Sequence, residues 1–247
     1  REAMVAPVVP EGDLEDVPKI IRNYKRNSTS YGVTPELHKG LLEAYYASVS
    51  FMDAQVGRVL DELEALGLAD NTIVVFTSDH GYLLGHHDKF QKQHLFEEAT
   101  RVPFIVSVPW MKNQHGKATT HITELIDLYP TLAELSGLTP PRSLQGNSML
   151  PLLKNPQSDD WKKELAFTIS RNGGESIRTP QWRFTQWDHG KGGMELYDLK
   201  KDPGEFNNLA RDSKHAGQLE KMKRQLESTR RGAGYSAARF SNKKRQK

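Results

Sequence analysis

A short apolar run that ends beside a carboxylate and an imidazole is the feature that most constrains the fold of this chain. The run is Thr-Ile-Val-Val-Phe at 72–76, and Asp79, His80 and Gly81 follow shortly after it. Short β-branched runs are typical of buried strands in parallel sheets that are covered on both faces. In open α/β sheets, ligands bind outside the carboxyl ends of the strands. The sequence therefore predicts an α/β fold with a polar site after this strand.

A long amphipathic helix is predicted directly before the strand. Thr34 is suited to be its N-cap, Pro35 its first residue, and Gly67 its end. Its apolar residues recur at spacings of three and four: Leu41, Tyr45, Val49, Met52, Val56, Val59, Leu60 and Leu63. This spacing places them on one face of the helix, so that helix and strand form an α-then-β unit.

The rest of the chain changes character at about residues 155–160. Before that point we expect a second strand at 102–108 and a helix at 123–135, which Pro130 should kink or divide and Gly137 should end. After it, short strands are predicted at 163–170, 175–179, 181–187 and 194–199, followed by an amphipathic helix at 212–231. Consecutive short strands with tight links predict an antiparallel sheet.

Composition and charge exclude several classes of protein. The 247 residues contain no cysteine, so disulfides, thiolate metal sites and a cysteine nucleophile are absent from these residues. The net charge is +3, but residues 230–247 carry seven positive charges and no acid, so the remainder is mildly acidic. We therefore expect no specific nucleic-acid partner. No apolar run approaches the roughly 20 residues of a membrane span, and residues 1–13 lack an apolar signal segment.

The chemistry of the central loop begins with Asp79 and His80. Adjacent strand residues point to opposite faces, so both can reach one site only if the chain leaves strand geometry, which Gly81 permits. A carboxylate with an imidazole suits Mg²⁺, Mn²⁺ or Zn²⁺, whereas Ca²⁺ prefers oxygen ligands. Two ligands do not complete a metal site, so we expect the others to come from elsewhere.

A basic cluster follows in the same loop, made of His86, His87, Lys89, Lys92 and His94. One interpretation is a positive pocket for a tetrahedral anion, in which lysine acts as a point charge and histidine protonates a leaving oxygen. The other interpretation is a solvated basic loop.

The order of several motifs resembles the type I sulfatases of the alkaline-phosphatase-like superfamily. The matching stretches are 46–53 (YASVSFMD), 56–58 (VGR), 71–81 (NTIVVFTSDHG), Leu84-Gly85-x-His87, Lys92, Glu98, 101–103 (RVP), 125–132 (LIDLYPTL), 144–148, 176–179 (SIRT), 195–199 (ELYDL) and 202–203. The Asp-His pair and the Ser-Ile-Arg-Thr stretch are most similar to the iduronate-2-sulfatase subgroup. The resemblance covers about residues 36–210.

This resemblance implies a domain organisation. Residues 1–34 would be an extended N-terminal segment, and 35–155 the C-terminal part of an alkaline-phosphatase-like α/β domain with a mixed or parallel sheet and flanking helices. Residues 156–231 would be a small antiparallel-sheet subdomain with a packed helix, and 232–247 a basic, disordered tail.

The resemblance also implies roles for individual residues. Asp79 and His80 look like metal ligands, with Ca²⁺ the usual ion of the family and Mg²⁺ an alternative. Lys92 looks like the lysine that binds the sulfate, and His87 matches a histidine near that pocket. Arg178 and His189 are candidates for substrate specificity, although ion-pair or sheet-surface roles are favoured for Arg178 and Arg183, and structural roles for Arg101 and Asp127.

The chain lacks two elements that the family's chemistry needs. These are the Cys/Ser-x-Pro/Ala-x-Arg motif, whose first residue becomes the formylglycine nucleophile, and the Asp-Asp pair near the family's N-terminus that supplies two further metal ligands. Our hypothesis is that an N-terminal portion of the same protein supplies both, and that its absence leaves an apolar surface exposed. The family's habit of secretion, periplasmic export or lysosomal residence is all that bears on localisation.

The function expected from this resemblance is metal-dependent hydrolysis of sulfate esters, on sulfated sugars, by the complete protein. These residues alone are expected to be inactive. A phosphodiesterase or phosphonate hydrolase of the same superfamily is the alternative enzyme. A non-catalytic module that binds sulfated glycans is the alternative from another class.

Overall fold

The computed structural model describes residues 5–24 and 26–234. Within this range the chain forms two compact units. The first unit contains the N-terminal residues to Gly12, Tyr24–His94 and Glu98–His115, and the second contains Asp13–Asn23, Leu95–Glu97 and the residues from Gly116 onward. The predicted domain ranges remain predictions, and most of the predicted basic tail lies outside the described residues.

The long helix of the first unit, α3 (Pro35–Ala65), confirms the predicted caps. Its N-cap Thr34 accepts a hydrogen bond from the backbone N–H of Leu37 at 3.2 Å, and Gly67 follows the helix with a φ of +67°. Of its 31 residues only Leu42 is buried. The predicted apolar face exists, but most of it is open to solvent in this unit: Leu41, Tyr45, Val49, Met52, Val59 and Leu60 are all exposed.

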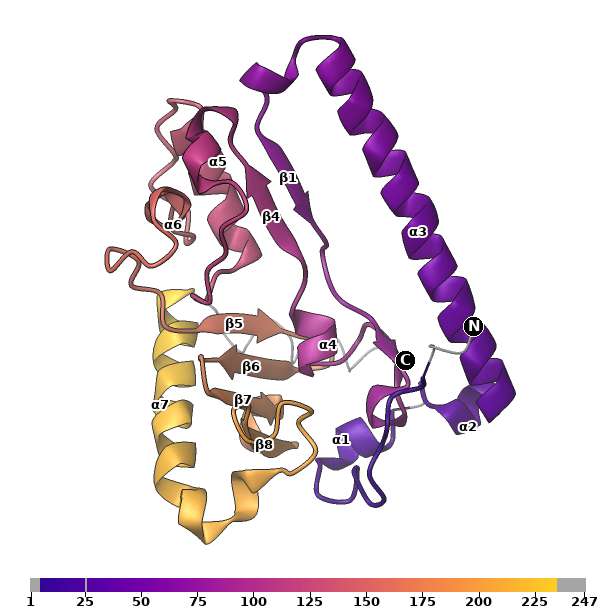
Figure 1. The fold of residues 1–247 in the computed structure, drawn as a ribbon. Helices are drawn as coiled ribbons and strands as arrows, with labels where there is room; N and C mark the ends of the chain where they lie inside the picture. The colour runs from indigo at the N-terminus through magenta and orange to yellow at the C-terminus, as the bar shows by residue number, and fades with distance from the viewer. Residues whose placement is uncertain (1–4, 25, 235–247) are drawn as a thin grey trace, which may run out of the picture. The chain divides into compact units, whose positions relative to one another are not determined.

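The strand after this helix is β1 (Val74–Thr77), which the short η1 (Ala69–Asn71) precedes. It pairs antiparallel with β4 (Phe104–Ser107), Val74 opposite Ser107 and Thr77 opposite Phe104, and the two strands lie side by side in Figure 1. Every residue of β1 is half-buried rather than fully buried as expected, and its described neighbour is antiparallel, which the predicted mixed sheet of an α/β fold allows. Burial on both faces requires further strands and covering helices, and these two strands form a sheet by themselves.

The chain between β1 and β4 forms a small hairpin, made of β2 (Leu83–Leu84) and β3 (Phe90–Gln91), with η2 (His86–Asp88) at its tip. The turn of helix α4 (Glu97–Thr100) follows, and η3 (Pro109–Gln114) comes after β4. Residues 1–34 are not wholly extended as predicted, because they contain α1 (Lys19–Arg22) and α2 (Ser28–Tyr31), each one turn long.

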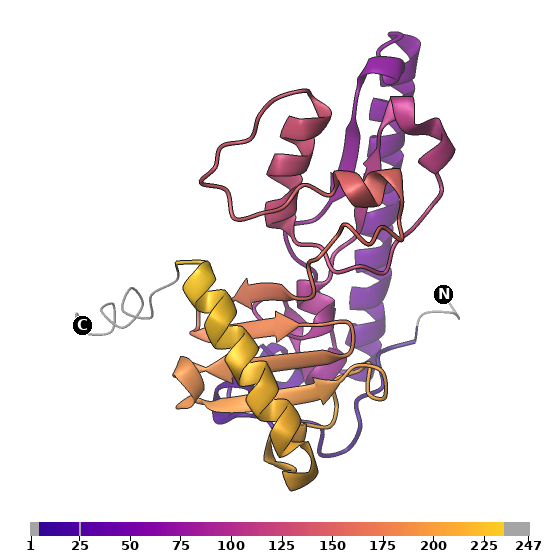
Figure 2. The same ribbon diagram turned by 90° about the vertical axis from the view of Figure 1, so that its left-hand side faces the viewer.

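The second unit is built on the predicted antiparallel sheet, whose strand order is β5 (Ala166–Ile169), β6 (Gly174–Arg178), β7 (Trp182–Trp187) and β8 (Gly193–Asp198). Helix α7 (Ala216–Gly232) lies across one face of it (Figure 2). Ile177, Phe184 and Leu196 of the sheet and Met222 and Leu226 of the helix form a fully buried core. The predicted amphipathic character of this helix is therefore confirmed.

Shorter elements complete the second unit. The predicted helix at 123–135 is divided into a 3-10 turn, η4 (Leu125–Asp127), and α5 (Leu128–Leu135), and Pro130 lies in the first turn of α5, where an N–H has no partner within the helix. The remaining elements are α6 (Leu150–Lys154), η5 (Asp188–Gly190), η6 (Leu209–Arg211) and η7 (Ser213–His215). Among the described residues, no helix has both the length and the apolar character that crossing a membrane requires.

Candidate functional site

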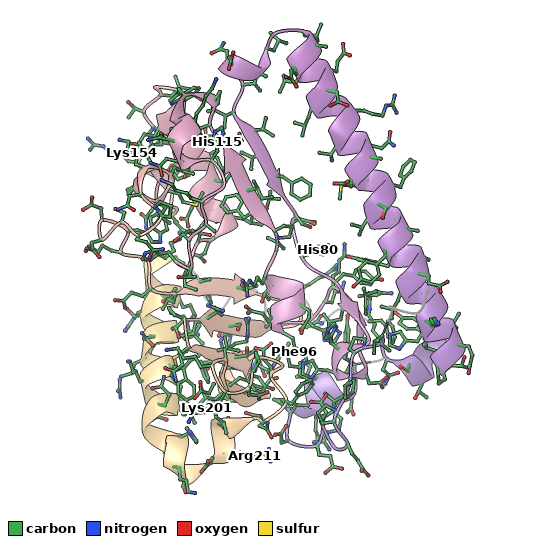
Figure 3. All side chains as sticks on the ribbon, in the orientation of Figure 1. His80, Phe96, His115, Lys154, Lys201 and Arg211 are labelled. Atoms are coloured by element: carbon green, nitrogen blue, oxygen red, sulfur yellow. The ribbon has the colours of Figure 1, made fainter. Side chains whose placement is uncertain are left out.

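The loop that leaves β1 carries the two predicted metal ligands. The strand ends at Thr77, and the Ser78 hydroxyl donates a hydrogen bond to the carbonyl oxygen of His80 at 2.8 Å, which folds the chain into a tight bend. Figure 3 shows His80 on this loop. The bend brings two adjacent side chains to one side, so that Oδ2 of Asp79 and Nε2 of His80 are 3.6 Å apart.

The orientation of the His80 ring favours metal binding. Its Nδ1 lies 2.8 Å from the carbonyl oxygen of Gly81, a group that can only accept, so Nδ1 carries the proton and donates it there. The lone pair of neutral His80 is then on Nε2, the atom that faces Asp79. Histidines that bind metals usually donate their other ring N–H to a carbonyl or carboxylate in this way.

The spacing of the two groups fits one cation. Two ligand atoms bound at right angles, each about 2.4 Å from a cation, lie about 3.4 Å apart, close to the 3.6 Å found here. The carboxylate of Asp79 is 83% exposed and His80 32% exposed, so an ion has access to both. In the described part of the chain no group of three or more such side chains could hold a metal, so this pair needs ligands from other groups.

Gly81 is needed in this loop because its backbone lies very close to the backbone of Glu98, and not because of an unusual backbone angle. Its φ is not positive, and the chain has already left strand geometry at Ser78. Its N–H donates to the carbonyl oxygen of Ala99 at 2.9 Å, and a Cβ on Gly81 would overlap the carbonyl oxygen of Glu98. The backbone around Ala99 therefore supports the loop directly.

The hairpin that follows is held by helix α3 and contains a strained backbone. The Nε2 atom of His38 lies 2.7 Å from the carbonyl oxygen of Leu84, and Gly85, with a φ of +105°, leaves room for the His38 ring. His87, Asp88 and Gln91 all have left-handed φ values, 54°, 50° and 74°. Such angles are costly for residues other than glycine and cluster at functional sites.

The basic cluster is mostly buried, so the solvated-loop interpretation is wrong for its main members. His87 is 1% exposed, Lys89 is fully buried and His94 is 4% exposed. Burial lowers the pKa of His94 to about 3, with a smaller contribution from Lys89, so this imidazole is neutral at pH 7. Burial also lowers the pKa of His86. Of the five residues, only Lys92 has an exposed side chain.

The predicted sulfate-binding pair thus occupies two environments. Lys92 is free to reach a ligand in solvent, whereas the His87 ring lies inside the hairpin. The positive pocket of five basic groups is not present in this unit, because three of them are inside and the buried His94 carries no charge.

The N-terminal segment contributes to this loop, which the sequence did not reveal. Asn27 forms a β-bridge with Lys89, and the N–H of Phe90 donates to the carbonyl oxygen of Arg26 at 2.9 Å. The Tyr24 ring meets the His94 ring edge-on, with 5.0 Å between centroids. Residues 24–27 show no hydrophobic periodicity in the sequence, so no sequence pattern predicts these contacts.

The candidates for specificity lie in the second unit. Arg178 forms an ion pair with Glu97 at 3.2 Å, and Arg183 forms ion pairs with Glu97 and Glu205, which confirms the favoured ion-pair roles. His189, in a turn of left-handed backbone, lies 3.3 Å from the buried carboxylate of Glu175 and is 37% exposed.

Comparisons with protein families match the chain to sulfatases. The family model described as "N-sulphoglucosamine sulphohydrolase, C-terminal" matches residues 85–232, and the model described as "Sulfatase" matches residues 17–138. A sulfatase of Formosa agariphila is 32% identical over 92% of this chain and 45% of its own length. Iduronate 2-sulfatase of Mus musculus is 32% identical over 79% of this chain and 49% of its own length. N-acetylglucosamine-6-O-sulfatase of Bacteroides thetaiotaomicron is 32% identical over 76% of this chain and 35% of its own length.

Solved structures give the same result. A 2-O GAG sulfatase superimposes with a TM-score of 0.81 at 27% identity, over 94% of this chain and 53% of its own. A protein in complex with its substrate D-glucosamine-2-N,6-O-disulfate has a TM-score of 0.68 at 27% identity, over 85% and 43%. A phosphonate monoester hydrolase of Agrobacterium radiobacter superimposes with a TM-score of 0.72 at 27% identity, over 81% of this chain and 43% of its own. The chain spans half or less of the length of the curated relatives named here.

Proposed function

This chain belongs to the sulfatase family, and we propose that it supplies metal- and sulfate-binding groups to a hydrolase of sulfate esters on sugars. The observation that carries this proposal is the arrangement of His80. Its Nδ1–H is bonded to a backbone carbonyl, and its Nε2 faces the Asp79 carboxylate at a separation suited to one shared cation.

The metal would be Ca²⁺, the ion that the family resemblance implies, with Mg²⁺ as the alternative. Asp79 and His80 would hold it, and the open face of this pair would receive the further ligands. A bound divalent cation would withdraw charge from a sulfate oxygen. The side chains of this chain would bind and orient the anion beside it.

Lys92 is the group we assign to the sulfate. Its side chain is exposed, unlike the other basic residues of its loop, and an ammonium group binds an anion as a point charge. His87 would act on the sulfate indirectly, because its buried ring shapes the hairpin that precedes Lys92. Neutral His94 is not suited to protonate a leaving oxygen near pH 7.

The substrate class is proposed from the relatives. Their names specify sulfated sugars: N-acetylglucosamine-6-O-sulfatase, iduronate 2-sulfatase and a glucosamine disulfate complex. In this chain, both His189 and Arg178 contact a glutamate, but His189 is the more exposed of the two side chains, 37% against 24%, and is therefore better placed to meet a sugar group.

We further propose that the formylglycine nucleophile comes from an N-terminal portion of the same protein. The exposed apolar stripe of α3 supports this, since a stripe of this size is normally covered in a folded protein. The half-buried strand β1 also lacks the cover that its sequence is suited to.

Paramagnetic broadening by Mn²⁺ tests the metal pair on this chain directly, and it detects weak binding. The amide signals of residues 79–81 should broaden first, and Asp79→Asn should remove the effect. The matched control is Asp53→Asn, which changes an exposed carboxylate on α3 and should leave the broadening intact. Equal broadening in Asp79→Asn and the unchanged protein would refute the metal assignment.

A phosphonate or phosphodiester hydrolase is the second candidate, because the Agrobacterium radiobacter enzyme shares this fold. Sulfate and phosphonate monoesters of one aryl alcohol, assayed side by side on the complete protein, separate the two. Higher kcat/KM for the sulfate ester supports the first proposal, and the reverse order supports the second. Binding of sulfated oligosaccharide without turnover of either ester would support the non-catalytic module.

A further inference from the structure

Leu95–Glu97 follow the loop that carries Lys92 (residues 92–94, called the Lys92 loop), and these three residues belong to the second unit, which contains the antiparallel sheet. Leu95 and Phe96 are 5% and 3% exposed, and Figure 3 labels Phe96. The Phe96 ring lies 6.4 Å from the ring of Tyr197 on β8. Leu95 lies against Gly174 of β6, where a Cβ would meet its methyl group. The segment 95–97 is therefore part of the sheet's own packing.

Glu97 ends this segment with polar contacts to both sheet arginines and to Glu205. Its carboxylate pairs with Arg183 on β7 and, at 3.2 Å, with Arg178 on β6. Its backbone N–H donates to Oε2 of Glu205 at 2.6 Å. The other carboxylate oxygen of Glu205 accepts from Nε of Arg183. Arg183 is thus the shared partner of two acids, and its side chain is only 2% exposed.

Glu205 is held in place by the turn that carries it. Its φ is +58°, a costly angle for a residue with a Cβ, and its side chain is 1% exposed. The Asp202 carboxylate stabilises the turn by accepting from the N–H groups of Phe206 and Asn207, at 3.1 and 2.8 Å. A buried acid at an unfavourable angle indicates that the surrounding structure requires it at this point.

We propose that Arg183 is a positioning residue that acts through Glu97 and Glu205 to fix the C-terminal end of the Lys92 loop. Lys92 precedes Leu95 by three residues, so their Cα atoms can be at most about 11 Å apart. The packing of segment 95–97 against the sheet therefore limits the movement of the chain at this end of the loop, and with it the movement of Lys92. This inference rests on the sulfate-binding role proposed for Lys92, but the anchor itself can be tested without sulfate.

Hydrogen exchange measured by mass spectrometry on the full chain gives that test. In Arg183→Met, peptides that cover residues 89–96 should exchange faster, by about tenfold or more. Arg183→Lys keeps the charge but loses the planar guanidinium that reaches two carboxylates. The exchange rate of these peptides in Arg183→Lys should therefore lie between the rates in the unchanged protein and in Arg183→Met. Glu205→Gln, which keeps the shape of the side chain, replaces Arg183→Met if the latter does not fold.

The matched control is Lys163→Met, which breaks a different buried ion-pair cluster in the same unit. It should lower the Tm without faster exchange in residues 89–96. If both variants accelerate these peptides equally, or if neither does, the positioning role is refuted. If the anchor behaves as expected but Lys92→Ala leaves sulfate affinity unchanged in the complete protein, then only the proposed function of Lys92 falls.

Discussion

The ammonium group of Lys163 lies 2.7 Å from Oδ1 of Asp127, a side chain with no exposure to solvent. Lys163 also contacts Oε2 of Glu124 at 2.6 Å. Asp127 in turn accepts hydrogen bonds from the N–H groups of Glu124 and Asn147, at 2.9 and 2.8 Å. The structural role predicted for Asp127 is confirmed, because one carboxylate joins the η4 turn to the chain before α6.

Lys163→Met should destabilise the protein by about 3–5 kcal/mol, since it leaves a buried carboxylate without its cation. The free energy of unfolding in urea measures the effect. Lys112→Met is the control: it removes an ion pair with Asp70 in which both side chains are more than 70% exposed. That change should stay within about 0.5 kcal/mol, and equal losses in the two variants would contradict the prediction.

His94 should make stability depend on pH. Its pKa is about 3 in the folded chain, below the ordinary 6.5, because burial disfavours the charged ring. The unfolded chain therefore binds this proton first, so the stability contributed by neutral His94 is complete above pH 6.5 and decreases as the pH falls towards 3. His94→Phe should flatten the fall in unfolding free energy between pH 7 and 4. His115→Gln, at an exposed position, should keep the original slope, and an unchanged slope in His94→Phe would show that His94 has no such effect.

Gly81→Ala should destabilise the chain by about 1–3 kcal/mol, since its Cβ would overlap the backbone at Glu98 and force a shift. The displaced loop should also weaken the Mn²⁺ broadening of residues 79–81. Gly57→Ala is the control, since nothing lies near that position on α3 and alanine favours helix by about 0.5–1 kcal/mol. Urea midpoints that rise in both variants would show that the close approach at Gly81 does not matter.

The apolar face of α3 should bind a fluorescent apolar dye such as ANS. Val49→Ser combined with Met52→Ser should reduce the fluorescence, because both side chains are about 40% exposed on that face. The free energy of unfolding should change by less than about 1 kcal/mol, since little buried area is lost. Lys39→Ser serves as the exposed polar control. If the double variant binds the dye as strongly as the unchanged protein, then the dye does not bind to the apolar face of α3.

Sequence patterns located most of the elements because their signals are local. Thr34, Pro35 and Gly67 bound α3 through capping and backbone preferences that need no partner. Pro130 lies in the first turn of α5 for a similar reason, because a residue without an N–H is tolerated there. The motif order likewise identified the sulfatase family, which the family comparisons then showed.

The chemistry of the loops was decided by tertiary structure. Nothing in the spacing of five basic residues separates buried His87, Lys89 and His94 from exposed Lys92. Lys89 and His94 are contacted by Asn27 and Tyr24, which are distant in the chain. The sequence by itself determined which side chains are available and where the long helices and the strands of the antiparallel sheet lie. Only the folded chain decided which of these side chains are desolvated, paired or open to a ligand, since those properties arise from contacts between residues far apart in sequence.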